Sequence, residues 1–323
     1  MSSATLADLS DTLVWLAVLS YVVAAPLLGL ELAYRSRWAG RAGVAVAIAG
    51  LAANLGAALT RGLAAGRVPW GNMYEYSMMV AAVVVTGWLV WVARRREVRP
   101  LGLFVLLLAA LAIAAAALTL RVPAGPLVPA LNSGWIKVHV VAAIIGTATL
   151  SLSSVFSALY LVAERNERRA APRPPLVAGG ARTADRAEVD EAITGYAVEE
   201  LEATEAAEAP ATGRRLKDLL PPAARLDDLA FRTTAFGFPI WTFAIMAGAI
   251  WAQSAWGRYW GWDPKETWSF ITWVVYAAYL HARATAGWRG RSAAWVSVLG
   301  LVAFVVNFYV VNTWVVGLHS YAK

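Results

Sequence analysis

The chain has 323 residues, of which 59% are hydrophobic and 15% are charged, and its formal net charge is +7. Repeated apolar runs of about 20 residues exclude an ordinary water-soluble domain and are typical of membrane-spanning helices. Cysteine is absent, so this chain forms no disulfide and cannot itself exchange thiols. We therefore expect an all-α, polytopic integral membrane protein.

Eight apolar segments are long enough to cross a bilayer as helices. In chain order they are residues 12–34, 42–60, 74–93, 101–120, 136–162, 235–253, 267–285 and 293–316. The N-terminus carries Asp8 and Asp11 where a signal peptide would be basic, so no cleavable signal peptide is expected. We expect one membrane domain, with helices one to five in residues 1–162 and helices six to eight in residues 231–323.

The segment between the fifth and sixth spans, residues 163–230, has a different composition. Six charged or polar residues at 164–169 are followed by a Pro/Ala/Gly stretch and then by an acidic run at 199–208. Such a composition buries too little apolar surface to fold alone. We expect a mobile cytoplasmic loop with one short helix at most.

The placement of lysine and arginine predicts the orientation of the chain in a plasma (inner) membrane. Four loops hold 21 of the 28 basic residues, namely 35–41, 94–99, 163–232 and 283–291. The positive-inside rule puts these loops in the cytoplasm, and therefore puts both termini on the outer side. The net charge follows from this topology and gives no reason to expect a nucleic-acid partner.

The outer connection between the sixth and seventh spans, residues 254–268, is rich in tryptophan. Its four tryptophans are Trp256, Trp260, Trp262 and Trp268. An interfacial aromatic belt explains isolated tryptophans but does not require four of them within 13 residues beside Arg258 and Lys265. The segment favours an aromatic platform for a planar ligand. The two cations are candidate contacts for ligand carboxylates, or for lipid headgroups.

Asp263 marks the start of the seventh span. It is followed by proline and, three residues later, by Glu266, which predicts an Asp version of the helix capping box. Asp263 is therefore expected to be a helix cap and not a general acid. Trp260 and Trp262 would then lie just above a rigid helix end.

The chain has only three histidines. His139 opens the fifth span and His319 follows the eighth, so both are expected near the Trp-rich loop, where two imidazoles can ligate the iron of a planar macrocycle. His281 lies roughly 20 Å deeper in the seventh helix, too far to share an iron whose ligands lie about 2 Å away. Each histidine can also be a packed imidazole with a hydrogen-bond partner, although ionisable groups inside membranes are functional candidates.

Several segments resemble the CcsA/ResC family of cytochrome c biogenesis proteins (System II), whose hallmark is a Trp-rich segment called the WWD domain. The resembling stretches read LDDLAFRTTAFGFP, WAQSAWGRYWGWDPKETW, YLHARATAGWRGR and GLHSY within residues 226–321, with PWGNMYEYS at 69–77 and WIKVHV at 135–140. These stretches cover somewhat under half of the chain. Taken together, in this order along the chain, they are highly specific for the family. Trp-rich proteins of the other bacterial maturation system share the loop, but the Asn-Met-Tyr-Glu and Leu-Asp-Asp-Leu segments favour CcsA/ResC.

The resemblance implies a haem-handling and haem-presenting subunit of a holocytochrome c synthase (haem lyase). Such a subunit receives haem b from the cytoplasmic side and delivers it, as a substrate in transit, to apocytochrome c for thioether attachment on the outer face. By position, His139 and His319 resemble the two external haem ligands, and His281 resembles one internal ligand. The second internal histidine belongs to a ResB/Ccs1-type membrane partner. A thiol-reducing maturation protein is a further expected partner.

Two other classes of function remain open at this point. One is a small-molecule membrane transporter that uses the tryptophans for gating, and the other is a structural assembly subunit without haem chemistry. Broken helices at mid-depth or an inverted repeat would favour a transporter, and the sequence suggests neither. Glu75, Asn307 and Asn312 are candidates either for lining a haem route or for hydrogen bonding between helices.

Overall fold

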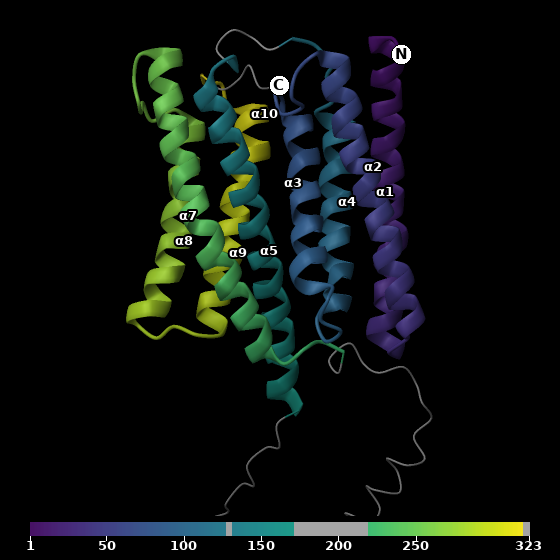
Figure 1. Cartoon of the computed structure of the whole chain (residues 1–323). Helices are drawn as coiled ribbons and strands as arrows, with labels where there is room; N and C mark the ends of the chain where they lie inside the picture. Colours follow the sequence, from purple (N-terminus) through teal and green to yellow (C-terminus); the bar gives the residue numbers. More distant parts are fainter. Residues whose placement is uncertain (127–130, 171–218, 319–323) are drawn as a thin grey trace, which may run out of the picture.

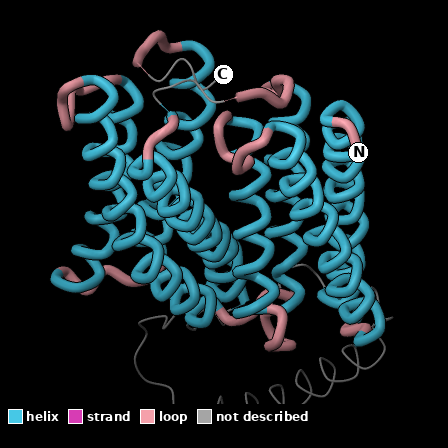
Figure 2. The backbone as a smooth tube through the Cα atoms, turned by 45° about the horizontal axis from the view of Figure 1, so that its top comes forward, coloured by secondary structure: helices cyan, strands magenta, loops and turns pink. Residues whose placement is uncertain are grey.

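The computed structural model describes residues 1–126, 131–170 and 219–318, which form a bundle of long helices without a β-strand in this part of the chain (Figures 1 and 2). The α-helices are α1 (Ser3–Tyr34), α2 (Arg37–Ala65), α3 (Met73–Gly87), α4 (Gly102–Thr119), α5 (Gly134–Ala170), α7 (Ala223–Trp256), α8 (Pro264–Thr285), α9 (Arg291–Val305) and α10 (Asn312–Trp314). Three shorter helices are η1 (Trp88–Val92), η2 (Arg99–Leu101) and η5 (Val306–Val311). The prediction of an all-α membrane protein is confirmed.

Seven of the described helices are long and apolar enough to cross a membrane. The helix α8 is not among them, since polar side chains such as Thr272 and His281 interrupt its apolar run. Its 22 residues nevertheless extend about 33 Å, slightly more than the hydrocarbon core of a bilayer. Figure 1 shows that α8 extends from the upper to the lower end of the picture at the left edge of the bundle, and it packs beside α9. The seventh predicted span is thus a helix of sufficient length but of lower hydropathy than its neighbours.

The helices alternate in direction, so the connections fall at two ends of the bundle. One end carries the start of α1, the α2–α3 and α7–α8 connections, the start of α5 and the helix α10 (Figure 1). We call it the upper end. The opposite, lower end carries the α1–α2, α3–α4 and α8–α9 connections. This arrangement brings the first turns of α5, which carry His139, to the same end as the Trp-rich loop.

Helix continues past both predicted borders of the segment 163–230. The helix α5 runs to Ala170 and α7 already begins at Ala223. Charged side chains support these extensions, because the Glu167 carboxylate accepts a hydrogen bond from the Ala223 backbone N–H at 2.8 Å and Arg283 pairs with Asp227 at 2.6 Å. Residues 171–218 of the predicted loop lie outside the described residues.

Small residues bring α5 and α7 close together. A Cβ placed on Gly146 would lie 3.2 Å from the backbone of Trp241, and one on Gly237 would lie 2.8 Å from a threonine hydroxyl of α5. The Ser153 hydroxyl donates a hydrogen bond to the Ala230 carbonyl at 2.8 Å across the same interface. Small and hydroxylated residues favour helix association in membranes because they let backbones approach. This interface positions His139 against α7.

Two apolar clusters pack the interior of the bundle. The larger one joins α1 to α4 with one side of α5 and includes the fully buried Tyr21, Trp88 and Leu106. The smaller one lies between α5, α7 and α8 around Trp241 and Tyr276. The candidate functional site adjoins the smaller cluster, at the upper end.

Candidate functional site

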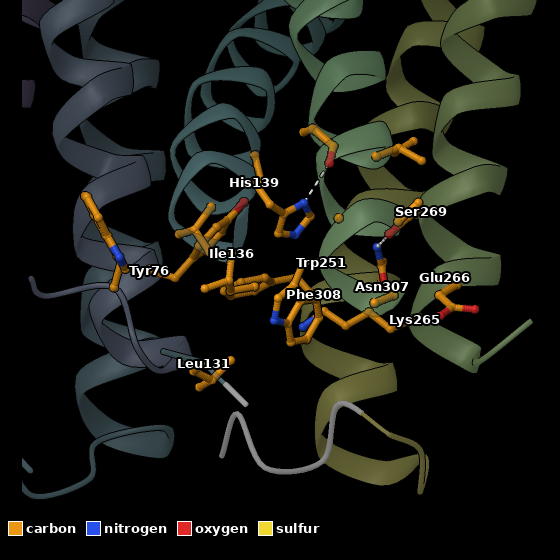
Figure 3. Close-up of a pocket in the computed structure, with 18 of the residues that line it drawn as sticks. Tyr76, Leu131, Ile136, His139, Trp251, Lys265, Glu266, Ser269, Asn307 and Phe308 are labelled. Carbon is orange, nitrogen blue, oxygen red and sulfur yellow. Dashed lines mark hydrogen bonds between the residues drawn. The ribbon is translucent and has the colours of Figure 1, made fainter. Parts of the chain in front are cut away.

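A cavity of about 180 Å³ lies at the upper end of the bundle, below the Trp-rich loop. Its walls come from α3, α5, α7, α8, α9 and η5, together with the segment before α3. Figure 3 shows side chains from these elements converging on it. The lining is mainly aromatic and aliphatic, with one histidine, one lysine, one glutamate and two asparagines. A concave, largely apolar pocket with a few polar groups is the usual form of a small-molecule site.

His139 projects from the second turn of α5 into this cavity (Figure 3). Its Nδ1 atom lies 2.7 Å from the carbonyl oxygen of Ala244 on α7. A carbonyl only accepts hydrogen bonds, so Nδ1 donates and the lone pair of the neutral imidazole lies on Nε2. Metal-binding histidines are oriented in this way, by a hydrogen bond from the ring nitrogen that does not bind the metal.

Gly248 provides the space for this ring. A Cβ on Gly248 would lie 2.7 Å from Nδ1 and 2.8 Å from Cε1 of His139. Any side chain at this position of α7 would therefore push the imidazole away from the Ala244 carbonyl. Neither Gly248 nor Ala244 was expected from the sequence. A glycine inside an apolar helix signals close packing, but the chain gives no local clue that its neighbour is His139, more than 100 residues earlier.

An aromatic wall closes the cavity opposite the Trp-rich loop. Tyr76 of α3 packs against Phe308 of η5 with ring centroids 4.9 Å apart, and Phe308 stacks on Phe304 at 5.9 Å. Phe304 in turn meets Trp241 edge to face at 6.1 Å. These four rings line the cavity, and the sequence analysis had selected none of them. Their spacing along α3, α7 and α9 resembles that of ordinary core residues.

The predicted tryptophans divide into two pairs. Trp256 and Trp260 line the cavity, and Trp256 packs against the buried Trp251 with ring centroids 4.8 Å apart. Trp262 is 64% exposed, has a left-handed backbone with φ of 57°, and packs edge to face against Trp260 at 5.7 Å. Trp268 is partly buried and does not line the cavity. Trp251 therefore joins the aromatic surface, and Trp262 faces outward from it.

The predicted capping box of α8 is confirmed. Asp263 is the N-cap residue, and Glu266 accepts hydrogen bonds from the backbone N–H groups of Gly261 at 2.8 Å and Asp263 at 3.1 Å. Asp263 is buried and does not line the cavity. The box fixes the loop to the first turn of α8, so Trp260 keeps a defined position over the cavity.

The two predicted cations lie in different environments. Lys265 lines the cavity, and its Nζ donates to the side-chain oxygen of Asn312 at 2.9 Å. Burial lowers the pKa of Lys265 to about 8, and the neighbouring Asp263 carboxylate acts in the opposite direction. The Arg258 guanidinium instead folds over Gly261, 3.6 Å from the Glu266 carboxylate, and does not line the cavity.

Three buried polar atoms of the cavity lining have no hydrogen-bond partner among the described residues. They are the side-chain oxygen of Asn307, one carboxylate oxygen of Glu266 and the indole nitrogen of Trp241. The Asn307 amide nitrogen donates to Ser269 at 3.0 Å. Buried polar groups are normally satisfied, so unsatisfied ones in a cavity indicate a bound molecule or ordered water.

Glu75 holds the segment that forms the rim of the cavity beside α3. Its fully buried carboxylate accepts hydrogen bonds from Arg61 at 2.9 Å, Arg67 at 2.7 Å and the Gly71 backbone at 2.8 Å. The same arginines donate to the carbonyl groups of Val122 and Gly125, which follow α4. The network joins α2, α3 and the segment after α4. It supports residues 70–73, which line the cavity, and Glu75 itself does not line it.

The other two histidines lie elsewhere. His281 is exposed near the lower end of α8, far from the cavity lining. It shares one face of α8 with the exposed Phe270, Val274 and Ala278, because these residues are spaced three or four positions apart. His319 lies outside the described residues.

Comparisons with known proteins agree on one family. The profile of the family described as "Cytochrome C assembly protein" matches residues 70–319. "Cytochrome c biogenesis protein CcsA" of Gloeothece citriformis is 36% identical over 294 residues, covering 87% of each chain. The CcsA protein of Guillardia theta is 34% identical over 273 residues, covering 81% of this chain and 79% of its own.

The fold is also similar to a solved structure. The "Cytochrome c Heme Lyase CcmF" superposes with a TM-score of 0.62 over 96% of this chain, at 17% sequence identity. The present chain spans only 47% of that protein. At this level of identity the likeness extends to the fold alone.

We predict that Glu75→Gln lowers the free energy of unfolding by about 3–5 kcal/mol, because the buried Arg61 and the partly buried Arg67 lose their shared carboxylate. Thermal unfolding of the detergent-purified protein measures this effect. The matched control is Glu97→Gln, since Glu97 is exposed and its replacement should change stability by less than about 0.5 kcal/mol. Equal stability of the two variants would contradict the proposed role of Glu75.

Proposed function

The chain belongs to the cytochrome c assembly family, as a CcsA-type cytochrome c biogenesis protein, and from this we propose that it is a haem-handling subunit that presents haem to apocytochrome c. The observation that carries the proposal is the orientation of His139. Its ring is held by the Ala244 carbonyl with Nε2 as the lone-pair nitrogen, at the edge of an aromatic cavity. An imidazole oriented in this way is suited to binding iron.

The aromatic surface matches the other part of a haem, its flat macrocycle. Trp256, Trp260 and Trp251 cover the upper side of the cavity, and the rings of Phe304 and Phe308 form its inner wall. Stacked and edge-to-face aromatic contacts give a planar ligand attraction beyond that of buried area alone. We infer that this surface holds the porphyrin while His139 holds the iron, with His319 as the second iron ligand.

Lys265 is the better candidate of the two cations for a haem propionate. It lines the cavity, whereas Arg258 is drawn toward Glu266. The propionate would replace or share the present Lys265 contact with Asn312. A hydrogen bond between an ammonium and a carboxylate in a site of low polarity is among the stronger polar contacts in proteins.

Haem itself supplies the vinyl groups to which cysteine thiols add, and each addition transfers the thiol proton to a vinyl carbon without net oxidation. The residues of this chain contribute proximity and orientation, because they hold the macrocycle at a fixed place and keep the iron ligated. The histidine of the apocytochrome motif then displaces one of the two ligands. Because this chain has no cysteine, a separate thiol-reducing protein has to keep the substrate cysteines reduced.

The upper end of the bundle is proposed to face the outer side of the plasma membrane. The support is the distribution of basic residues, which gather in the lower connections. The cavity would then open toward the compartment in which apocytochrome c is modified. The transporter and structural-subunit alternatives are not favoured, because the relatives are cytochrome c biogenesis proteins.

His281 supports a second, internal haem site shared with a ResB/Ccs1-type partner. An exposed imidazole within a membrane helix would face lipid if no partner covered it, at a cost of about 1–3 kcal/mol without a hydrogen bond. The stripe of Phe270, Val274 and Ala278 on the same face offers an apolar surface for a partner helix. Among the described residues no second histidine lies near His281.

The proposal is tested by the visible spectrum of the chain purified together with its partner. We predict that His139→Gly leaves one iron position vacant, so the bis-histidine spectrum is lost and added imidazole restores it. Gly248→Ala should give the same change although His139 is present, because the methyl group displaces the ring. Gly87→Ala is the control, since its added methyl has no neighbour closer than 4.0 Å. An unchanged spectrum in both variants rules out His139 as an iron ligand.

We predict that Lys265→Met weakens binding of haem about 10- to 100-fold, the range expected for a lost charge-assisted hydrogen bond. Haem dimethyl ester, which lacks propionate charges, should bind the wild type and Lys265→Met equally.

The same contact predicts a pH dependence. In the wild type, the ammonium form of Lys265 predominates below pH 8, so affinity for haem should fall as the pH rises through about 8. The ester should show no such fall. If Lys265→Met weakens the binding of haem and of haem dimethyl ester to the same extent, Lys265 does not contact a propionate.

We predict that His281→Ala removes one of two haems from the complex with the partner and leaves the outer haem in place. Val274→Ala, on the same exposed face of α8, is the matched control for loss of contact area without loss of a ligand. Haem content and spectra of the chain alone and of the complex measure the outcome. The shared site is refuted if the chain alone holds two bis-histidine haems, or if His281→Ala leaves haem content unchanged.

A further inference from the structure

The side chain of Asn312 lies between α8 and the last turn of η5. Its Oδ1 atom accepts a hydrogen bond from the Lys265 Nζ at 2.9 Å, and its Nδ2 atom donates one to the Phe308 carbonyl at 2.7 Å. Asn312 is only 5% exposed and does not line the cavity, whereas Lys265 and Phe308 both do. One buried amide outside the cavity thus connects a cation of the lining to the backbone of an aromatic residue of the lining.

The bond to Phe308 is a consequence of the geometry of η5. This segment is a π-helix, whose wide turns depart from the bonding pattern of an α-helix and are frequent at functional sites. In an α-helix the backbone N–H of Asn312 would bond to the Phe308 carbonyl, four residues earlier. Here it bonds to the Tyr309 carbonyl. The Asn312 side chain supplies the Phe308 carbonyl with a donor instead.

The amide of Asn312 fits its two partners in one orientation only. An ammonium group only donates hydrogen bonds and a carbonyl only accepts them. Exchanging Oδ1 and Nδ2 would therefore set donor against donor and acceptor against acceptor. The Phe308 carbonyl thus directs the amide oxygen toward Lys265. A leucine at position 312 would fill a similar volume and would offer Lys265 no acceptor.

A lysine that binds an anion at a defined place needs such an acceptor. Its four-carbon stem is flexible, and its ammonium group is a point charge with three donors. The bond to Asn312 uses one donor of Lys265 and leaves two for a ligand in the cavity. Asn312 can therefore hold the ammonium group in place while an anion is bound.

We propose that Asn312 is a positioning residue, which fixes the Lys265 ammonium group relative to the Phe308 wall of the cavity. The cavity then prefers flat ligands that carry a carboxylate at their edge. This inference rests on the proposed function, in which Lys265 contacts a haem propionate and Phe308 belongs to the surface that holds the macrocycle. Asn312 acts through these two residues and does not touch the ligand.

The first test compares the binding of haem and of haem dimethyl ester to the wild type and to Asn312→Leu, each as the full chain in complex with its membrane partner. Haem should bind Asn312→Leu about tenfold more weakly, because the ammonium group is no longer held, whereas the ester should bind both proteins equally. Adding Asn312→Leu to Lys265→Met should cause no further loss, because Asn312 acts through Lys265. Unchanged haem binding, or an equal loss of haem and ester, overturns the proposal.

Asn54→Leu is the matched control for the loss of a buried amide. Asn54 is 1% exposed, and its Nδ2 atom donates to the Met78 carbonyl at 3.2 Å, away from the cavity lining. Its replacement removes a bond between helices but no contact with Lys265. The preference for haem over the ester should therefore equal that of the wild type. If Asn54→Leu loses this preference as Asn312→Leu does, the effect belongs to helix packing and the positioning role is wrong.

The second test needs no haem. The chain has four lysines, so NMR of protein with isotope-labelled lysine side chains can follow Lys265, whose signal is the one missing in Lys265→Met. Loss of an acceptor disfavours the ammonium form, so the pKa of Lys265 should be about one unit lower in Asn312→Leu than in the wild type. The Asp263 carboxylate, which raises this pKa, is retained.

The titration also separates the two proposals. The pKa of Lys265 should stay unchanged in Asn54→Leu, and an unchanged pKa in Asn312→Leu overturns the positioning role. If the wild type binds neither haem nor the ester, the proposed function fails, whereas the titration still decides whether Asn312 holds the ammonium group.

Discussion

The candidate site depends on the close approach of α5 and α7. Gly146, Gly237 and the Ser153 hydroxyl bring the two backbones together along their length, and at the upper end the same proximity lets His139 reach the Ala244 carbonyl. Gly248 leaves room for the ring. The imidazole of His139 thus fills the space that a side chain at position 248 of α7 would occupy. A histidine held by packing and by a backbone acceptor keeps one tautomer and one direction, as a ligand for a metal must.

The remaining walls of the cavity are held in place by polar groups of two kinds. On the side of α3, the buried Glu75 joins two arginines and the Gly71 backbone, so a charged network supports an apolar rim. On the side of α8, backbone N–H groups are satisfied by Glu266 and Asp263. Both arrangements bury carboxylates that are bonded to several donors. Removal of one partner from such a network is costly, which favours a single geometry of the cavity.

The sequence predicted the parts of this structure that depend on local patterns. Helical spans follow from apolar runs, and the capping box follows from the spacing of Asp263 and Glu266. His139 could be selected because histidine is rare in this chain. Gly248, Ala244 and the ring of Phe308 could not be selected, because their roles arise from contacts between helices. The cluster of tryptophans was found as a group, but only the folded loop separates Trp260, over the cavity, from the exposed Trp262.

The pairing of Tyr76 with Phe308 has a consequence for biosynthesis. These rings belong to α3 and η5, so about 230 further residues have to be made after Tyr76 before the contact can exist. The Asp263 bond to Leu318 likewise forms only after Leu318 has been made. Because chains emerge from the ribosome N-terminus first, a nascent or truncated protein has His139 in the membrane but no closed aromatic wall around it. If the proposed function holds, haem would be retained only by chains that already include Phe308, and shorter nascent chains would not sequester it.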